Sequence, residues 1–80
     1  MGYIDHVEVY LEAQENTTAI YRIHSVISYD SKDNEIKNYQ ELAYVDEFNG
    51  SDGDYEQEVV DYVASKVGVD KDIVEIKGYI

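Results

Sequence analysis

Apolar and polar side chains alternate through the stretch Val7-Glu8-Val9-Tyr10-Leu11-Glu12-Ala13-Gln14. A period of two residues is typical of a β-strand with one buried face, because successive side chains of a strand point to opposite sides. We therefore predict a strand over residues 5–14, with its odd-numbered side chains in the core.

The segments that follow this strand also favour β-structure. Residues 19–29 are rich in β-branched and aromatic side chains and predict a second strand after a polar turn at residues 15–17. A second turn at residues 30–34 leads into a third strand over residues 36–46, whose apolar side chains fall in both parities, so we expect a bulge or a strand buried on both faces. Residues 73–80 alternate again and predict the last strand.

One segment has helical periodicity. Apolar side chains recur there at intervals of three and four residues: Tyr55, Val59, Tyr62, Val63 and Val67. The helix is expected to run to about Lys66, with Tyr55 and Tyr62 in the core. Asp54 and Gln57 have the spacing of a capping box at its start, and Gly68 is placed to end it in the left-handed conformation.

The predicted element order is β-β-β-α-β in a single domain, residues 1–80. The fold class is α+β: a small antiparallel sheet with one helix packed on one face. If the last strand runs parallel to the third, the connection through the helix is a right-handed crossover. Whether the last strand pairs beside the third or beside the first stays open. The chain has no Cys, so hydrophobic burial alone must stabilise this fold.

Charge sets the chain apart from an average domain. It has 18 Asp and Glu against 6 Lys and Arg, a formal net charge of −12. Such a chain repels nucleic acid and anionic lipid, so we expect no direct nucleic-acid partner and no membrane partner. No basic residue occurs between Lys37 and Lys66, a stretch that carries eight carboxylates.

Catalytic and metal-binding patterns are weak. If the first hairpin turns at Asn16, Glu8 lies nearly opposite His24, but a general base also needs a nucleophile and a pocket. The two histidines, His6 and His24, lack the ligand spacing of a zinc site, and Asp52-Gly53-Asp54 is only a fragment of a calcium loop. We expect no enzyme activity, no metal and no cofactor.

The predicted helix carries a row of carboxylates. Asp54, Glu58 and Asp61 follow i, i+4, i+7 spacing, which puts successive charges about 5 to 6 Å apart along the axis. Such a row can imitate the phosphates of a nucleic-acid strand, and tyrosine adds rigid contact area. The expected partner-binding residues are Asp54, Glu58, Asp61, Glu56, Asp52, Asp46, Glu47, Glu41 and Tyr10.

The leading hypothesis is a protein-binding module, an acidic, nucleic-acid-mimicking inhibitor of a basic nucleic-acid-binding protein. Anti-CRISPR proteins and other small inhibitors of nucleases have this physical character, which is an analogy of class. The alternative is a structural or oligomerisation domain, a homodimer through a sheet edge. Carboxylates that serve solubility alone, or a halophilic cell, are the remaining interpretation. The N-terminus has neither a basic nor an apolar leader region, so a cytoplasmic location is expected.

Overall fold

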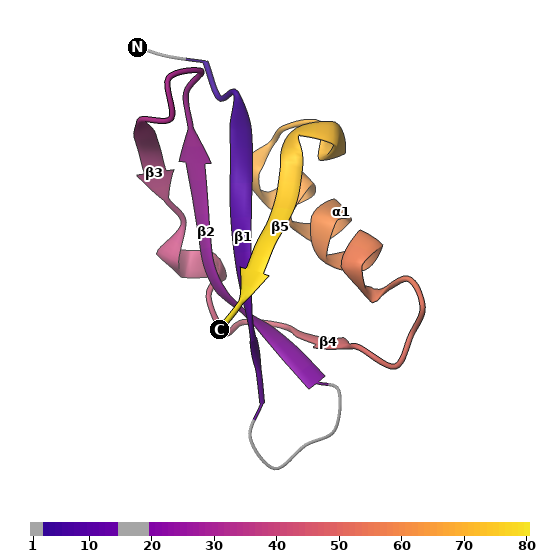
Figure 1. Ribbon diagram of the computed structural model, residues 1–80. Coiled ribbons are helices and arrows are strands. Elements are labelled where there is room, and N and C mark those ends of the chain that lie inside the picture. The colour runs from indigo at the N-terminus through magenta and orange to yellow at the C-terminus, as the bar shows by residue number, and fades with distance from the viewer. Residues whose placement is uncertain (1–2, 15–19) are drawn as a thin grey trace.

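The computed structural model describes residues 3–14 and 20–80. They form an α+β domain of one mixed sheet and one α-helix, which confirms the predicted fold class (Figure 1). The elements in chain order are β1 (His6–Ala13), β2 (Ile20–Tyr29), β3 (Glu35–Asn38), the 3-10 helix η1 (Gln40–Leu42), β4 (Glu47–Asn49), α1 (Tyr55–Val67), the 3-10 helix η2 (Lys71–Ile73) and β5 (Val74–Tyr79). The predicted turn at residues 15–17 lies outside the described residues.

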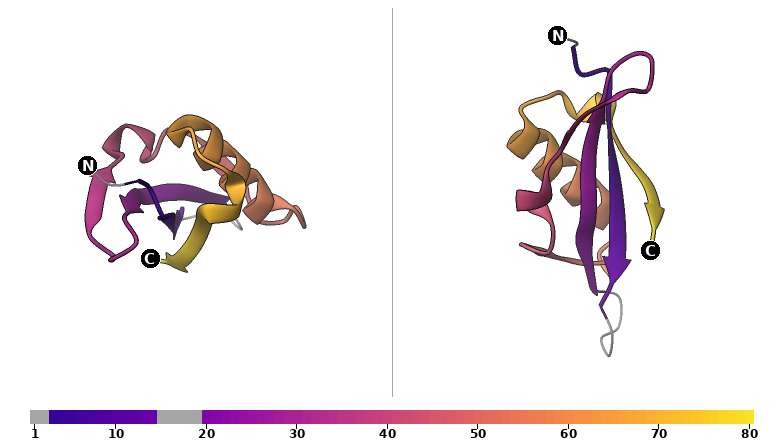
Figure 2. Two further views of the ribbon diagram at one scale, coloured as in Figure 1. Left: turned by 90° about the horizontal axis from the view of Figure 1, so that it is seen from above. Right: turned by 90° about the vertical axis from the view of Figure 1, so that its left-hand side faces the viewer.

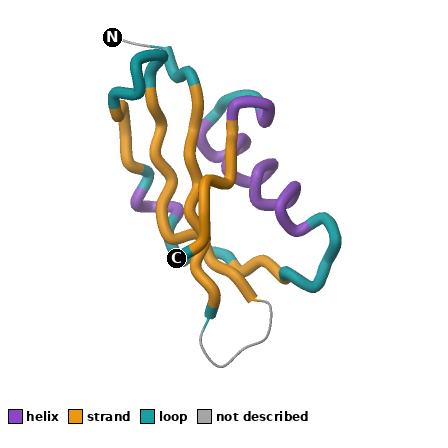
Figure 3. The backbone as a smooth tube through the Cα atoms, viewed as in Figure 1, coloured by secondary structure: helices purple, strands orange, loops and turns teal. Residues whose placement is uncertain are grey.

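The strand order is β3-β2-β1-β5, with β4 pairing with the other end of β2 (Figure 3). β1 is antiparallel to β2 and parallel to β5, so the sheet is mixed instead of wholly antiparallel. The last strand therefore pairs beside the first strand. β4 and β1 are both antiparallel to β2, so β4 runs in the same direction as β5. β2 and β1 lie between β4 and β5, and α1 connects these two outer strands along the chain.

One face of the sheet is covered and the other is open. Figure 2 shows α1 and η1 on the same side of the sheet. The core lies between these layers and consists of Val7, Val9, Leu11, Ile23, Val26, Leu42, Phe48, Val59, Val63, Ala64 and Val74. The odd-numbered side chains Val7, Val9 and Leu11 are fully buried, as the alternation predicts, whereas the even-numbered side chains of β1 face the open side.

The predicted third strand over residues 36–46 is wrong as one continuous element. β3 ends at Asn38, and η1 carries Leu42 into the core before the chain resumes pairing with β2 in β4. The N–H groups of Tyr39 and Tyr44 donate to Val26 O (2.8 Å) and Ile23 O (3.0 Å), so the middle of β2 stays hydrogen-bonded. A straight strand could not bury Leu42 and also keep Tyr44 outside, because both belong to one parity.

The two ends of α1 differ in how well they were predicted. Gly68 adopts φ = 85° and its N–H donates to Ala64 O at 2.8 Å, so the predicted left-handed helix end is confirmed. The predicted capping box is wrong: the Asp54 carboxylate makes no capping hydrogen bond, and the Gln57 amide donates to Asp61 instead (2.9 Å). Asp54 has φ −105° and ψ 15°, outside the extended conformation that aims a cap side chain at the helix N–H groups.

Candidate partner-binding surfaces

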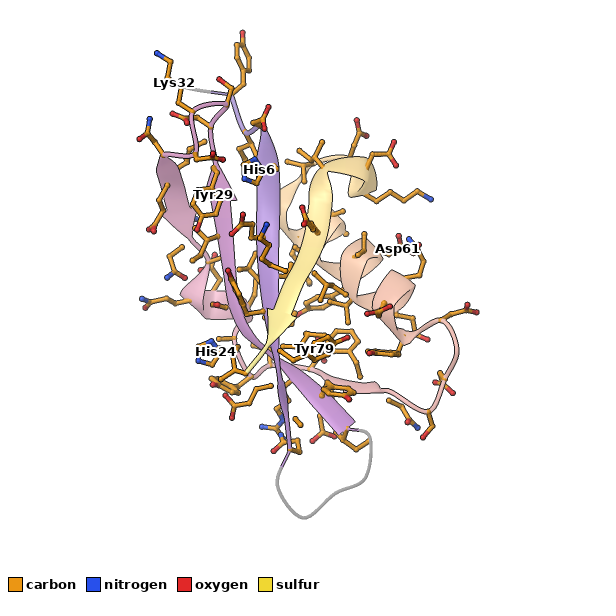
Figure 4. All side chains as sticks on the ribbon, viewed as in Figure 1. His6, His24, Tyr29, Lys32, Asp61 and Tyr79 are labelled. Carbon is orange, nitrogen blue, oxygen red and sulfur yellow. The ribbon has the colours of Figure 1, made fainter. Side chains whose placement is uncertain are left out.

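The acidic residues at the start of α1 are exposed and lack basic partners. Asp52, Asp54, Glu58 and Asp61 are all exposed, and no lysine or arginine nitrogen lies within ion-pair distance of them in the described part of the chain, which holds all six basic residues. Asp61 accepts the hydrogen bond from Gln57. The predicted row therefore keeps its negative charge on the surface of α1, where Figure 4 places Asp61.

Glu56 belongs to a tyrosine cluster where α1 passes β5. The Tyr79 hydroxyl donates to Glu56 Oε2 at 2.9 Å and lies 2.5 Å from the Tyr55 hydroxyl. Burial, followed by these hydrogen bonds to Tyr55 and Glu56, raises the pKa of Tyr79 well above its usual range. Tyr21 stacks on Tyr55 at a ring separation of 5.4 Å. Sequence reasoning missed this cluster, because its members come from three elements that only folding brings together.

The other three predicted acids have partners. Asp46 is hydrogen-bonded to the Tyr62 hydroxyl of α1; burial, followed by this hydrogen bond, raises the pKa of Tyr62. Glu47 forms an ion pair with Arg22 at 2.8 Å, and Glu41 forms one with Lys37 at 3.7 Å. Glu41 and Glu47 thus each have a neighbouring cation, unlike the exposed acids at the start of α1. Tyr55 and Tyr62 pack against the core, as predicted.

Tyr10 is separated from all of these acids by the sheet. Its neighbours Val9 and Leu11 point into the core under α1, so the Tyr10 side chain lies on the open face. Its ring covers Gly78 of β5, where Tyr10 Cδ1 and Cε1 would be 3.7 Å from a β-carbon on that glycine. Tyr10 and the acids of α1 therefore belong to two different surfaces. The sequence already implied this separation, because Tyr10 has the opposite parity to the strand residues predicted to lie in the core under the helix.

His6 is the most heavily paired side chain of the open face. Its Nδ1 lies 2.9 Å from Asp5, and its Nε2 lies 3.5 Å from both Glu8 and Asp33. The hydrogen bond to Asp5 raises the pKa of His6, with the charges of Asp5, Asp33 and Glu8 acting in the same direction and burial opposing them. The imidazole stacks on Tyr29 at 5.2 Å, and Figure 4 shows the two rings side by side in front of the sheet.

The predicted pairing of Glu8 with His24 is wrong. Glu8 lies opposite Ile27, and His24 falls at a register shift of β2, between the partners of Tyr10 and Leu11. This bulge moves His24 out of the simple alternation. The His24 ring makes an edge contact with Tyr44 and a weak hydrogen bond to Ser25 (3.4 Å), and no carboxylate in the described residues holds it for general base chemistry.

A shallow pocket lies at the far end of the sheet from His24. Tyr3, Ile4 and Asp5 line it on one side, and the turn residues 30–34 contribute its other side, with the exception of Asp33. The Asp30 carboxylate accepts the N–H groups of Lys32 and Asn34 at 2.9 Å each, so this predicted turn is confirmed. The Asp30 carboxylate therefore stabilises the turn through these hydrogen bonds.

Within residues 3–14 and 20–80, no three His, Asp or Glu side chains converge in a geometry that could hold a metal ion. Among the helices of the described chain, none has the length and apolar character needed to span a bilayer. The chain matches no known family model, no curated protein and no solved structure.

Proposed function

We propose that this domain is a protein-binding module that presents the carboxylates of α1 to a basic, nucleic-acid-binding partner and thereby inhibits it. The observation that carries the proposal is the row Asp54, Glu58 and Asp61, exposed and without a lysine or arginine at ion-pair distance among the described residues. The proposal places the protein in the cytoplasm, where such partners act on nucleic acid.

The physical argument is one of charge spacing on a rigid support. Asp54 and Glu58 repel each other at i, i+4, which costs a helix a few tenths of a kcal/mol. The buried side chains Val59 and Val63 anchor α1 to the sheet, so the row is held in place before any partner arrives. A partner surface that normally binds a row of phosphates would form charge-assisted hydrogen bonds with these carboxylates at similar spacing. Attraction between the opposite charges would also speed the association of the two proteins.

The experiment is competition between this protein and DNA for basic nucleic-acid-binding proteins. A labelled duplex is bound to each member of a panel of such proteins, and its displacement is followed by fluorescence anisotropy at low and at high salt. We expect displacement of DNA from at least one member, weakening steeply with salt because charged contacts are screened. Displacement from none of them at low salt, or displacement insensitive to salt, would contradict the proposal.

A matched pair of variants tests the site. Asp54→Asn, Glu58→Gln and Asp61→Asn together remove three charges from the row, and Glu35→Gln, Asp70→Asn and Asp72→Asn remove three from exposed positions elsewhere. We expect the first set to weaken inhibition at least about tenfold and the second about twofold or less. Removing a carboxylate that contacts the partner costs more binding free energy than lowering the overall negative charge of the protein by the same amount. Equal losses would show that net charge alone acts.

A second candidate function is oligomerisation through the edge of β5. Within the described residues β5 pairs only with β1, and the exposed side chains Tyr79 and Ile80 lie at its end. An unpaired edge strand is a template for a strand from another chain. Light scattering during size exclusion separates the candidates: a salt-insensitive dimer favours oligomerisation, and a monomer favours the inhibitor.

A further inference from the structure

Two carboxylates stand side by side on the open face of the sheet. Glu8 of β1 is in register with Glu75 of the parallel neighbour β5, and both face away from the core because Val7, Val9 and Val74 point into it. Adjacent strands are about 4.8 Å apart, so these like charges are close neighbours. Like charges at such positions on a sheet face destabilise it.

The surroundings of Glu8 make this placement more costly. Its side chain is only 16% exposed, and its sole ion-pair neighbour in the described chain is His6 at 3.5 Å. Glu75 is 59% exposed and has Lys77 at 3.8 Å, an exposed pair of small net strength. A largely covered carboxylate whose one ion-pair neighbour is a histidine loses that cation when the imidazole is neutral, and a permanently charged cation supplied from outside would replace it.

Tyrosine rings border the two carboxylates. Tyr10 is the next residue of β1 after Glu8 that points to the open face. Its ring lies over Gly78 of β5, so it borders the two carboxylates on the side of the sheet formed by β1 and β5. On the β2 side, Ile27 lies opposite Glu8, and Tyr29 stacks on His6. Arginine fits such surroundings, because its guanidinium binds carboxylates through several N–H groups and stacks on aromatic faces.

We propose that the open sheet face binds a basic segment of a partner protein, with one arginine side chain beside Glu8 and Glu75 and its guanidinium plane against Tyr10. These residues lie on the central strand and its neighbour, so they are fixed before binding and little ordering is needed. Because α1 covers the opposite face, this site can be occupied or lost without any change at the acidic row of the helix.

Charge excludes a second copy of this chain as the favoured occupant. Each copy carries a formal charge of −12, and three of its six basic side chains are in ion pairs with their own carboxylates. Stacking two open faces would bring Glu8 and Glu75 of one copy toward the same residues of the other. A basic segment, in contrast, neutralises both carboxylates at once.

The test uses a synthetic peptide of about nine residues in which arginine alternates with threonine, which favours an extended chain. Its control peptide replaces each arginine with citrulline, which has nearly the same shape and no charge. Amide chemical shifts of the labelled protein are followed during titration at low salt, and the affinity is measured by calorimetry. We expect shifts concentrated on β1 and β5 around Glu8, Tyr10 and Glu75, and no binding of the citrulline peptide.

Two double variants with the same change in net charge identify the site. Glu8→Gln with Glu75→Gln should weaken binding at least about tenfold, whereas Glu58→Gln with Asp61→Asn should weaken it about twofold or less. Equal weakening by both pairs, shifts confined to α1, or binding of the citrulline peptide would overturn the proposal. Loss of binding only in the Glu58→Gln/Asp61→Asn variant would show that the peptide binds the acidic row of α1 and not the open sheet face. The experiment therefore distinguishes failure of this proposal from failure of the proposed function.

Stability measurements separate a binding role from a structural one. At a pH where His6 is neutral, Glu8→Gln alone should leave the urea midpoint unchanged or raise it, because the change then removes repulsion with Glu75 and no ion pair. Weakened peptide binding together with an unchanged or higher midpoint supports the proposal. A lower midpoint, or a dimer of the unmodified protein that protects the open face, would overturn it.

Discussion

Single carboxylates in this chain differ mainly in their neighbours. Glu47 has Arg22 at 2.8 Å, Glu8 has only His6 at 3.5 Å, and Glu58 has no ion-pair partner among the described residues. The first is neutralised, the second is partly covered beside another acid, and the third is exposed to solvent. The same residue type therefore contributes to stability in one place and carries charge for a partner in another.

His6 makes stability depend on pH in a predictable direction. Its pKa is raised from the usual 6.5 because Asp5, Asp33 and Glu8 favour the charged imidazolium. The stabilisation is complete below the unfolded pKa and is lost as pH rises through the folded one. We therefore expect the urea midpoint of the protein to fall relative to that of His6→Gln as the pH rises above about 6.5, the ordinary pKa of histidine.

The comparison with His6→Gln removes the contributions of other titrating groups. Both proteins share the same remaining carboxylates and the same Tyr29, so only the pH slope that belongs to the imidazole differs between them. Parallel pH profiles for the two proteins would show that the contacts at 2.9 and 3.5 Å do not stabilise the folded state.

At the scale of elements, the segment between β3 and β4 is the clearest departure from local pattern. Residues 36–46 have the composition of a strand, yet the chain forms η1 there and buries Leu42 in the common core. Tyr44 takes φ = 60°, a left-handed conformation that is rare for a tyrosine, and its hydroxyl donates to Glu12 on the open face (2.8 Å). Tertiary contacts on both faces of the sheet thus hold this segment.

Two substitutions in this segment test that description. Leu42 is 8% exposed and Ile36 is 42% exposed, although both belonged to the same predicted strand. Leu42→Ala should lower the free energy of unfolding by about 3 kcal/mol through the cavity it leaves. Ile36→Ala should lower it by about 0.5 kcal/mol. Urea denaturation measures both, and similar losses would indicate a regular strand buried on both faces.

At the scale of the whole molecule, charge opposes compaction. The formal charge is −12, and the three Lys or Arg ion pairs of the described residues are all at exposed positions. Self-repulsion of this kind weakens a folded state and is screened by salt. The single core has to offset this repulsion, and the dependence of stability on salt concentration measures how large the repulsion is.

Salt should therefore raise thermal stability. Between about 20 mM and about 500 mM sodium chloride we expect Tm to rise by about 5 °C, equivalent to about 1 kcal/mol for a domain of this size. The increase should be smaller in Asp54→Asn/Glu58→Gln/Asp61→Asn, which has less repulsion to screen. A Tm that falls with salt would mean that attractive ion pairs outweigh the repulsion. Calorimetry or circular dichroism gives the measurement.

The amino-acid sequence by itself determined the local elements and the total charge. Alternation marked β1 and β5 within a residue or two, and β-branched and aromatic composition marked β2. Three-and-four spacing marked α1, and Gly68 marked its end. These features depend on neighbours along the chain, because strand and helix periodicity set which side chains share a face. The acidic character of the helix surface was visible for the same reason.

Only the tertiary structure decided which distant segments meet. It placed β5 beside β1 and interrupted the predicted strand over residues 36–46 with η1. It also paired two of the predicted site acids with cations, Glu47 with Arg22 and Glu41 with Lys37. It also brought Glu8 next to Glu75, 67 positions later in the chain. Strand order and register follow from the burial of all apolar faces in one core, a condition that no single segment contains.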